Sequence, residues 1–161
     1  MAWVEASLEE MKITLPEPVK TPPGARVPFA WVQVRGDRAY ASGHAALNED
    51  GSPAGPFGKV GAEVSPEEAY VAARGAGIAI LSTLKRELGD LDRVSAWLMV
   101  TGLINAAPDF GGHTNVINGF SELILDLYGP EAGLHARAAP GVASLPFGLS
   151  VIVMAEVEID G

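Results

Sequence analysis

The sequence contains no cysteine, which excludes disulfide bonds, thiolate metal ligands and a cysteine nucleophile. Basic residues are also scarce, with 11 lysines and arginines against 20 aspartates and glutamates and a net charge of -9. A surface of this sign repels phosphate backbones, so we expect no nucleic-acid partner. No apolar stretch approaches the roughly 20 residues that span a bilayer, and the first residues lack the cationic start of a secretory signal. These absences predict a soluble, cytoplasmic protein that does not bind membranes.

Metal and cofactor motifs are missing as well. His44, His113 and His135 show no metal-ligand spacing, and no HExxH motif occurs. Gly75-Ala76-Gly77 lacks the third glycine of a dinucleotide fingerprint, and Lys59 is not followed by the serine or threonine of a phosphate loop. We therefore expect no metal, no cofactor and, because no GxSxG motif is present, no serine acyl chemistry.

The length and the apolar fraction fit one well-buried domain, with 161 residues of which 48% are apolar. Ser65-Pro66-Glu67-Glu68 is a strong helix start, and Gly89 is the predicted end of that helix. A second long helix is predicted from a helical apolar pattern that begins near Ile117 and stops at Gly129-Pro130. Runs rich in β-forming residues predict five strands, at residues 29–34, 38–44, 94–104, 136–142 and 149–159.

The first 28 residues differ in character from the rest. Apolar residues at helical spacing from Val4 to Leu15, with Ser7 and Glu10 in the pattern of a capping box, predict a short N-terminal helix. Five prolines in the remainder of this segment enforce extended backbone. We therefore divide the chain into an N-terminal helix with a proline-rich connector, residues 1–28, and a main domain, residues 29–161.

The order of the elements predicts an α+β fold in which both long helices cover one face of a mixed β-sheet. Consecutive apolar side chains from Trp97 to Val100 must point to both faces of that sheet. We therefore expect the face without helices to pack on another subunit.

Three positions break a local rule, and such positions tend to mark functional sites. Arg137 lies in an apolar strand, where a guanidinium is costly unless it meets an anion; an exposed edge arginine or an internal ion pair explains it equally well. Asn118-Gly119 is a turn dipeptide inside a helical pattern, so Gly119 indicates the close approach of another backbone, and Asn118 either presents its amide to a ligand or serves packing. Ser42-Gly43 either faces a cleft or merely ends a strand.

Several motifs occur together in the main domain: Ala41-Ser42-Gly43-His44, Gly58-Lys59-Val60-Gly61, Asn118 in the second helix, His135-Ala136-Arg137-Ala138 and Val142-Ala143-Ser144-Leu145-Pro146. In this combination the chain resembles the Rid, or YjgF, family of reactive intermediate deaminases, also called endoribonuclease L-PSP-like proteins, from about Phe29 to Glu158. The N-terminal helix and the connector resemble a longer subgroup of that family. The resemblance implies a chorismate-mutase-like α+β fold, assembled as a homotrimer whose sheets form a central barrel.

The resemblance also implies a site and a reaction. Ligands of the family lie in clefts between subunits, where the arginine that matches Arg137 pairs with the carboxylate of a 2-imino or 2-oxo acid. Ser42, Gly43 and Asn118 match further substrate-binding residues. The family reaction hydrolyses an imine or enamine of an amino acid to a 2-oxo acid and ammonia, without cofactor or metal.

Three family residues are replaced in this chain. The deaminases carry a glutamate where this chain has Ile152, a tyrosine where it has the candidate substrate-binding residue Phe29, and a cysteine where it has Ala139. An isoleucine cannot transfer a proton, so hydrolysis requires another group or is lost. His135 is the candidate catalytic residue beside Arg137, because a strand would direct both side chains to the same face and histidine titrates near neutral pH.

Three functions follow from these observations. The first is a trimeric hydrolase of imines or enamines with Arg137 as the carboxylate anchor. The second is a non-catalytic binder of small carboxylates, which the retained arginine and the missing glutamate favour. The third is an endoribonuclease or translation inhibitor, which the family label suggests and the negative charge opposes.

Overall fold

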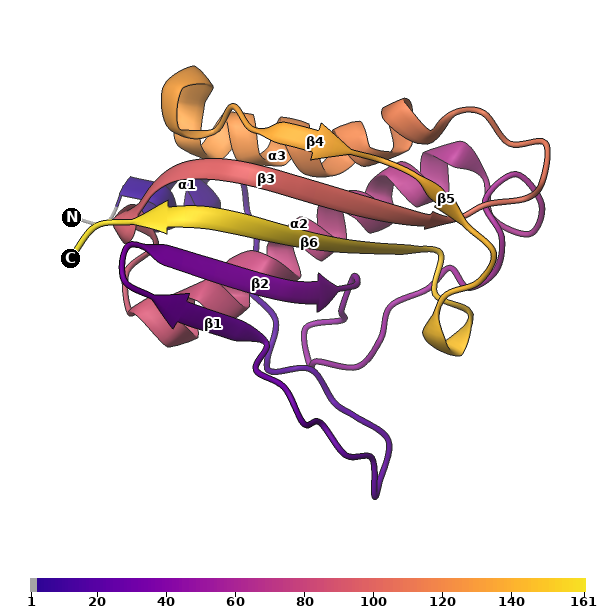
Figure 1. Ribbon diagram of the computed structural model, residues 1–161, viewed down its shortest axis with the longest axis horizontal. Coiled ribbons are helices and arrows are strands. Elements are labelled where there is room, and N and C mark those ends of the chain that lie inside the picture. The colour runs from indigo at the N-terminus through magenta and orange to yellow at the C-terminus, as the bar shows by residue number, and fades with distance from the viewer. Residues whose placement is uncertain (1–2) are drawn as a thin grey trace.

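One mixed sheet forms the front layer of the molecule, and the helices lie behind it (Figure 1). The computed structural model describes residues 3–161, and across that range six strands join the sheet in the spatial order β1-β2-β6-β3-β4, with β5 also pairing with β3. Neighbouring strands are antiparallel, except that β4 and β5 run parallel to β3. The strands are β1 (Val32–Arg35), β2 (Arg38–His44), β3 (Val94–Asn105), β4 (Ala136–Ala138), β5 (Gly141–Val142) and β6 (Val151–Ile159).

The helices are α1 (Trp3–Glu10), α2 (Pro66–Leu88) and α3 (His113–Ala132), with two short 3-10 turns, η1 (Leu91–Arg93) and η2 (Pro146–Gly148). The long helices α2 and α3 pack against each other and against the same face of the sheet (Figure 1). This arrangement confirms the predicted α+β class. Across residues 3–161, none of the helices has both the length and the apolar character needed to cross a membrane.

Helix α2 begins and ends as its sequence predicts. The Ser65 hydroxyl accepts the backbone N–H of Glu68 at 3.1 Å, and the Glu68 carboxylate accepts the N–H of Ser65 at 3.0 Å, which completes a capping box. Gly89 ends the helix in the left-handed region, with φ of 83°.

The contact between α2 and α3 depends on Gly119. A Cβ atom added at this position would collide with the backbone carbonyl of Tyr70 in α2. The predicted close approach of another backbone is therefore confirmed, and it accounts for a glycine inside a helix. The regular part of α3 also stops as predicted, because Gly129 adopts a non-helical conformation with φ of 77°.

The predicted bounds of three strands were wrong. The predicted strand 136–142 is divided into β4 and β5 at Pro140, which has no N–H for a sheet ladder. The predicted strand 29–34 begins only at Val32, because Ser42 bonds the carbonyls of Ala30 and Trp31 in place of a regular ladder. The last strand begins at Val151 instead of 149, because η2 and its cap precede it.

The predicted capping box of the N-terminal helix was also wrong, because Ser7 lies inside α1. The helix is instead capped from a distant part of the chain, since the Asp92 carboxylate accepts the N–H groups of Trp3 at 2.6 Å and Val4 at 2.8 Å. Val4 and Leu8 of α1 are buried in the main core, and the connector that follows has no regular element, as predicted. Residues 1 and 2 of the predicted 1–28 segment lie outside the described residues.

The strand β6 shows which face of the sheet is open. Its odd-numbered residues from Val151 to Ile159 are buried under the helices, whereas the even-numbered residues from Ile152 to Glu158 lie on the other face and contact solvent. Tyr40 of β2 and Met99 of β3 flank Glu156 in register on this open face and are 43% and 39% exposed. Apolar side chains of the open face are therefore uncovered in the single chain, beside the ion pairs of Arg38 with Glu156 and Glu158.

Candidate functional site

Arg137 extends from β4 to the neighbouring helix α3. Its Nη1 donates to Oδ1 of Asn118 at 2.9 Å and to Oγ of Ser121 at 3.0 Å, and its Nη2 donates to the carbonyl of Thr114 at 3.3 Å. The backbone of Arg137 lies beside Val100 in the parallel ladder with β3. Strand and helix together therefore fix both ends of this side chain.

The partners of Arg137 come from one stripe of α3. Thr114, Asn118 and Ser121 are four and three residues apart, which is the spacing of side chains on one face of an α-helix. We call these three residues, with Arg137 and His135, the arginine cluster. Arg137 and Asn118, which were each predicted as site residues, are thus brought together directly.

All three hydrogen-bond partners of Arg137 are neutral. Among residues 3–161, no carboxylate lies within ion-pair distance of its guanidinium. The group is half-buried, and a guanidinium offers five N–H donors. Arg137 therefore carries an uncompensated positive charge in a fixed orientation, which favours an anion.

His135 is the outer member of the arginine cluster. Its Nδ1 lies 2.7 Å from the carbonyl of Gly133, which can only accept, so Nδ1 carries the proton. Its Nε2 then accepts from the Ser121 hydroxyl at 2.8 Å, while the oxygen of Ser121 accepts from Arg137. Burial lowers the pKa of His135 below 6.5, the Gly133 carbonyl opposes this change, and the charge of Arg137 adds to it. The ring is therefore neutral near pH 7.

The other candidate residues lie toward the opposite edge of the sheet. The Ser42 hydroxyl donates to the carbonyl of Ala30 at 2.7 Å. Gly43 faces Ile152, and a Cβ atom at Gly43 would lie 2.8 Å from Cγ2 of Ile152. Phe29 precedes β1 and is 52% exposed.

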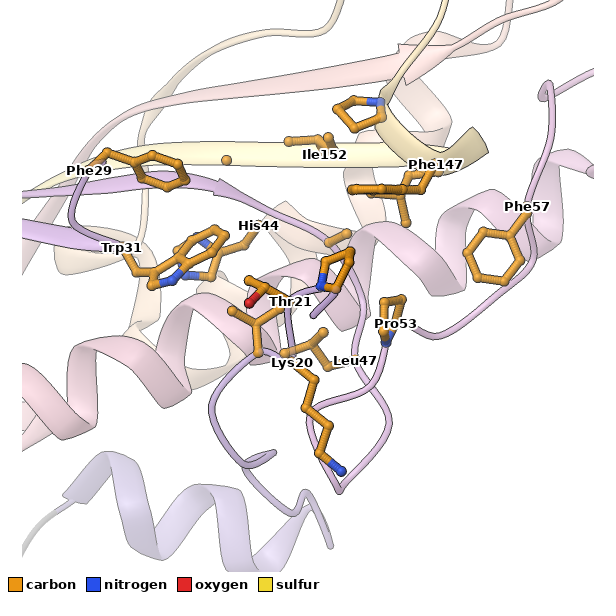
Figure 2. A pocket seen from close by; sticks show the side chains of 16 residues that line it. Lys20, Thr21, Phe29, Trp31, His44, Leu47, Pro53, Phe57, Phe147 and Ile152 are labelled. Atoms are coloured by element: carbon orange, nitrogen blue, oxygen red, sulfur yellow. The ribbon is translucent and has the colours of Figure 1, made fainter. Parts of the chain in front are cut away.

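A cavity of about 820 Å³ opens beside Phe29, Gly43 and Ile152 (Figure 2). Its walls are mainly apolar and come from the connector, the end of β2, the loop after β2 and the turn η2. The lining residues are Val19, Lys20, Thr21, Pro22, Phe29, Trp31, Gly43, His44, Ala45, Leu47, Pro53, Phe57, Pro146, Phe147, Leu149 and Ile152. Arg137, Asn118, His135 and Ser42 do not line it.

One chain therefore does not bring all the predicted site residues together. The strands β3 and β6 separate Arg137 on β4 from Gly43 on β2, and β3 separates it from Ile152 on β6. The predicted residues fall into two groups, the arginine cluster and the cavity side of the sheet.

His44 is the inner wall of the cavity and is only 5% exposed. Its Nδ1 lies 2.5 Å from the carbonyl of Ser42, its Nε2 lies 3.0 Å from Oγ1 of Thr83 in α2, and its ring packs edge-on against Trp31. Burial lowers the pKa of His44, the Ser42 carbonyl opposes this, and the charge of Arg86 adds to it. With its ring neutral, His44 thus holds the bulge of β2 at Ser42 and Gly43 in place.

One acidic group, Glu5, Asp90 and Asp92, has the spacing of metal ligands. Asp92 already caps α1, and Glu5 pairs with Lys85 at 2.7 Å, so these carboxylates serve the docking of α1. None of the three lines the cavity or hydrogen-bonds to Arg137 or His135, and no role in the site is assigned to them.

Sequence reasoning missed several residues of both groups. Ser121 was detectable, because it shares the helical spacing of Asn118, whereas Thr114 contributes its backbone carbonyl, which side-chain spacing does not mark. The cavity walls Trp31, Phe57 and Phe147 carry no local signal, because only the tertiary fold brings the connector, the loop and η2 together.

The fold and the two groups of residues define a class of protein: an α+β protein of chorismate-mutase-like fold with an arginine-centred polar cluster. No family model matches the chain. Protein TCP17 from Trypanosoma cruzi is 36% identical over 157 residues, which cover 98% of this chain and 94% of that protein. The crystal structure of Atu1372, a protein of unknown function from Agrobacterium tumefaciens, is 36% identical, with a TM-score of 0.86 over 99% of this chain and 93% of that one.

A candidate endoribonuclease from Shewanella oneidensis is 26% identical, with a TM-score of 0.85 over 97% of this chain and 99% of that one. RidA from an Antarctic Psychrobacter shares the fold at 19% identity, with a TM-score of 0.56 over 89% of this chain and 99% of that one. The chain belongs to the YjgF/Rid family of endoribonuclease L-PSP-like proteins.

Proposed function

We propose that the protein binds small 2-imino and 2-oxo acids through Arg137 and hydrolyses imines and enamines of amino acids. One observation carries this proposal: within the described part of the chain, residues 3–161, the acceptors that hold the guanidinium in place are all neutral. Asn118 and Ser121 orient the group without cancelling its charge, which is what an anion site requires. A carboxylate that docks there gains charge-assisted hydrogen bonds, and bidentate ones where two N–H groups remain accessible.

We propose further that the site is shared between subunits of a homotrimer. Arg137 and the pair Gly43 and Ile152 lie apart in one chain, so a neighbouring copy is needed to join them. The open face of the sheet supports this assembly, because Tyr40 and Met99 gain from burial against another subunit. The family resemblance supports a cleft between subunits as the site.

The proposed reaction needs only water. Water adds to the imine carbon while the imine nitrogen takes up a proton, which gives a carbinolamine. The carbinolamine loses its hydroxyl proton and expels the nitrogen as ammonia, which leaves the 2-oxo acid. An enamine enters the same sequence after protonation at carbon. Arg137 holds the carboxylate beside the C=N bond, so the acceleration comes from position and charge stabilisation.

The proton transfers in this reaction occur without the family glutamate, which is Ile152 here. The predicted catalytic role of His135 stays a prediction. Because both of its ring nitrogens are hydrogen-bonded, we propose that His135 acts as a positioning residue, which orients Ser121 and through it Arg137. A cytoplasmic location also stays a prediction.

The test generates 2-imino acids in situ from several amino acids and measures their conversion to 2-oxo acids with and without the protein. We expect a rate above the uncatalysed reaction that is lost in Arg137→Ala. Arg26→Ala, which removes an exposed arginine of the connector, serves as the control and keeps the rate. Equal rates with and without wild-type protein contradict the hydrolase.

A non-catalytic carboxylate binder is the second candidate, and Ile152 is the observation that favours it, because an apolar side chain cannot transfer a proton. Calorimetric titration with pyruvate separates the two: binding that depends on Arg137 without turnover supports the binder. Incubation with RNA tests the endoribonuclease alternative, and we expect no cleavage because of the charge of -9.

A further inference from the structure

The cavity beside Gly43 and Ile152 is much larger than a three-carbon acid requires. It measures about 820 Å³, within the range of about 300–1,000 Å³ in which proteins bury drug-sized ligands. Pyruvate has a single methyl group to place there. The size of the cavity therefore points to a larger side chain on the ligand.

Four aromatic rings surround this space, those of Phe29, Trp31, Phe57 and Phe147. Figure 2 shows the ring of Phe147 extending over the cavity toward Ile152. Phe147 is 75% exposed and has a φ of 58°, a left-handed backbone conformation that is strained for an aromatic residue. Strain of this kind tends to persist at ligand sites, where a side chain must be presented in one direction.

The connector supplies the floor of the cavity. Val19 to Pro22 line it, and hydrogen bonds fix this segment to the loop after β2: the N–H of Glu17 donates to the carbonyl of Glu49 at 2.9 Å, and the N–H of Lys20 donates to that of Gly51 at 2.9 Å. The connector, to which the sequence assigns no role, thus forms part of the cavity lining.

The cavity offers no free charge of its own. Lys20 is the charged residue of the lining, and its ammonium pairs with Asp50 at 3.5 Å, away from the interior (Figure 2). The buried ring of His44 is neutral near pH 7, because burial lowers its pKa. A ligand that fits these walls carries an uncharged side chain.

We infer that the cavity receives the side chain of the bound acid and selects 2-imino and 2-oxo acids with long aliphatic or aromatic side chains. This inference rests on the proposed function, in which Arg137 of a neighbouring subunit holds the carboxylate. The apolar walls favour each added methylene, because transfer of apolar surface from water is favourable.

Calorimetric titration of the wild-type protein with straight-chain 2-oxo acids tests the inference. Pyruvate, 2-oxobutanoate, 2-oxopentanoate and 2-oxohexanoate differ by one methylene at each step, and we expect binding to tighten about fourfold per step, or about 60-fold across the series. 2-Oxoglutarate, with the same number of carbons as 2-oxopentanoate and a charged end, binds more weakly than 2-oxopentanoate. Equal affinities across the series overturn the inference.

Two substitutions assign the effect to the cavity. Ala45→Phe fills the space from the lining, and we expect it to reduce the affinity for 2-oxohexanoate to that for pyruvate, with pyruvate binding changed less than about twofold. Phe147→Ala removes an exposed side chain of the wall and leaves the core unchanged, and we expect it likewise to reduce the gain in affinity per added methylene. Ala62→Phe, on an exposed loop outside the lining, is the matched control and leaves the series unchanged.

The outcomes separate this inference from the proposed function. If Arg137→Ala abolishes binding of every acid and the wild-type series is flat, the cavity inference alone fails. If Arg137→Ala leaves pyruvate binding intact, the proposed carboxylate anchor fails. If none of the acids binds, both fail.

Discussion

Ser121 Oγ and His135 Nε2 lie 2.8 Å apart at the contact between α3 and β4, and the same hydroxyl oxygen accepts from Arg137 at 3.0 Å. A single hydroxyl therefore connects a neutral imidazole to a charged guanidinium. The arrangement holds only while Nε2 is unprotonated, because a protonated ring has no acceptor to offer. His44, whose pKa is also lowered, is neutral in the same way inside the core.

We expect acid to destabilise the fold through these two histidines. Burial lowers both pKa values below the ordinary 6.5, so the unfolded chain takes up protons at a higher pH than the folded chain. The contribution of these two histidines to the free energy of unfolding is therefore fully present above about pH 6.5 and is lost as the pH drops from there toward the folded-state pKa values. Urea unfolding at a series of pH values measures this slope. His44→Gln and His135→Gln should each make it shallower, and an unchanged slope in both variants contradicts the assignment.

A carboxylate placed at position 118 should neutralise the arginine cluster from within. Asn118→Asp puts a negative charge where Oδ1 now lies 2.9 Å from Arg137, and we expect pyruvate affinity to fall by about 10- to 100-fold. Asn118→Gln, which keeps the amide, controls for the change of side chain. Unfolding of each variant checks the fold, and tight pyruvate binding by a folded Asn118→Asp protein is incompatible with Arg137 as the anion site.

A carboxylate at position 152 should increase the rate of imine hydrolysis, whereas the carboxylate at position 118 lowers the affinity. Ile152→Glu supplies a proton-transfer group beside Gly43 at the proposed cleft, and general acid or base catalysis contributes about 100-fold or more. We expect imine hydrolysis to accelerate, with a rate that follows the ionisation of the new carboxyl group. Ile152→Gln is the uncharged control. Equal rates for wild type and both variants argue against a reaction centre at this position.

Because α2 packs closely on α3, a single added methyl group should lower the free energy of unfolding. In Gly119→Ala the new Cβ meets the backbone of Tyr70, which cannot turn aside as a side chain can, so the helices must separate. We expect a loss of about 1–3 kcal/mol in the free energy of unfolding, although alanine favours a helix by about 1 kcal/mol over glycine. Gly111→Ala, which meets no atom within 4 Å, is the control. Equal stability of the two variants rejects this role for Gly119.

The anchoring of α1 depends on a carboxylate far away in the sequence. Asp92→Ala leaves the N–H groups of Trp3 and Val4 without their acceptor, and loss of such a cap costs about 0.5–2 kcal/mol. Exposed Asp109 provides the control substitution Asp109→Ala. Urea denaturation compares the two, and equal midpoints would show that the cap contributes nothing.

The elements that the sequence predicts best are those whose signals are local. Ser65 and Gly89 bound α2 because caps act within a few residues, and the residues of α3 that face the core repeat at helical spacing. Some of the errors have their physical origin in long-range contacts, whereas the division of strand 136–142 at Pro140 has a local cause. The cap of α1 comes from Asp92, 88 positions away from Val4, and no local pattern contains it.

The site residues also divide into those with a local signal in the sequence and those without one. Arg137 was found because a guanidinium in an apolar strand is costly, and Asn118 was found because it precedes a glycine inside a helical pattern; their direct hydrogen bond was not predicted. The cavity was not predicted, because its walls come from segments as distant as Thr21, Phe57 and Phe147 and each of them is unremarkable in sequence. The separation of Arg137 from Gly43 also follows from strand order, which single-strand patterns do not contain.

Mixing two defective variants decides whether neighbouring subunits share the site. Arg137→Ala removes the carboxylate anchor, and Gly43→Phe blocks the proposed cleft itself beside Ile152, where even its Cβ atom would lie 2.8 Å from Cγ2 of Ile152. Each variant alone should bind no pyruvate, whereas an equimolar mixture that has exchanged subunits should recover about one quarter of the wild-type sites, because random pairing joins an intact arginine to an intact cavity in that fraction of interfaces. Calorimetry counts these sites. No recovery after exchange, measured beside full binding by exchanged wild-type protein, would contradict a site built from Arg137 of one subunit and Gly43 of the next.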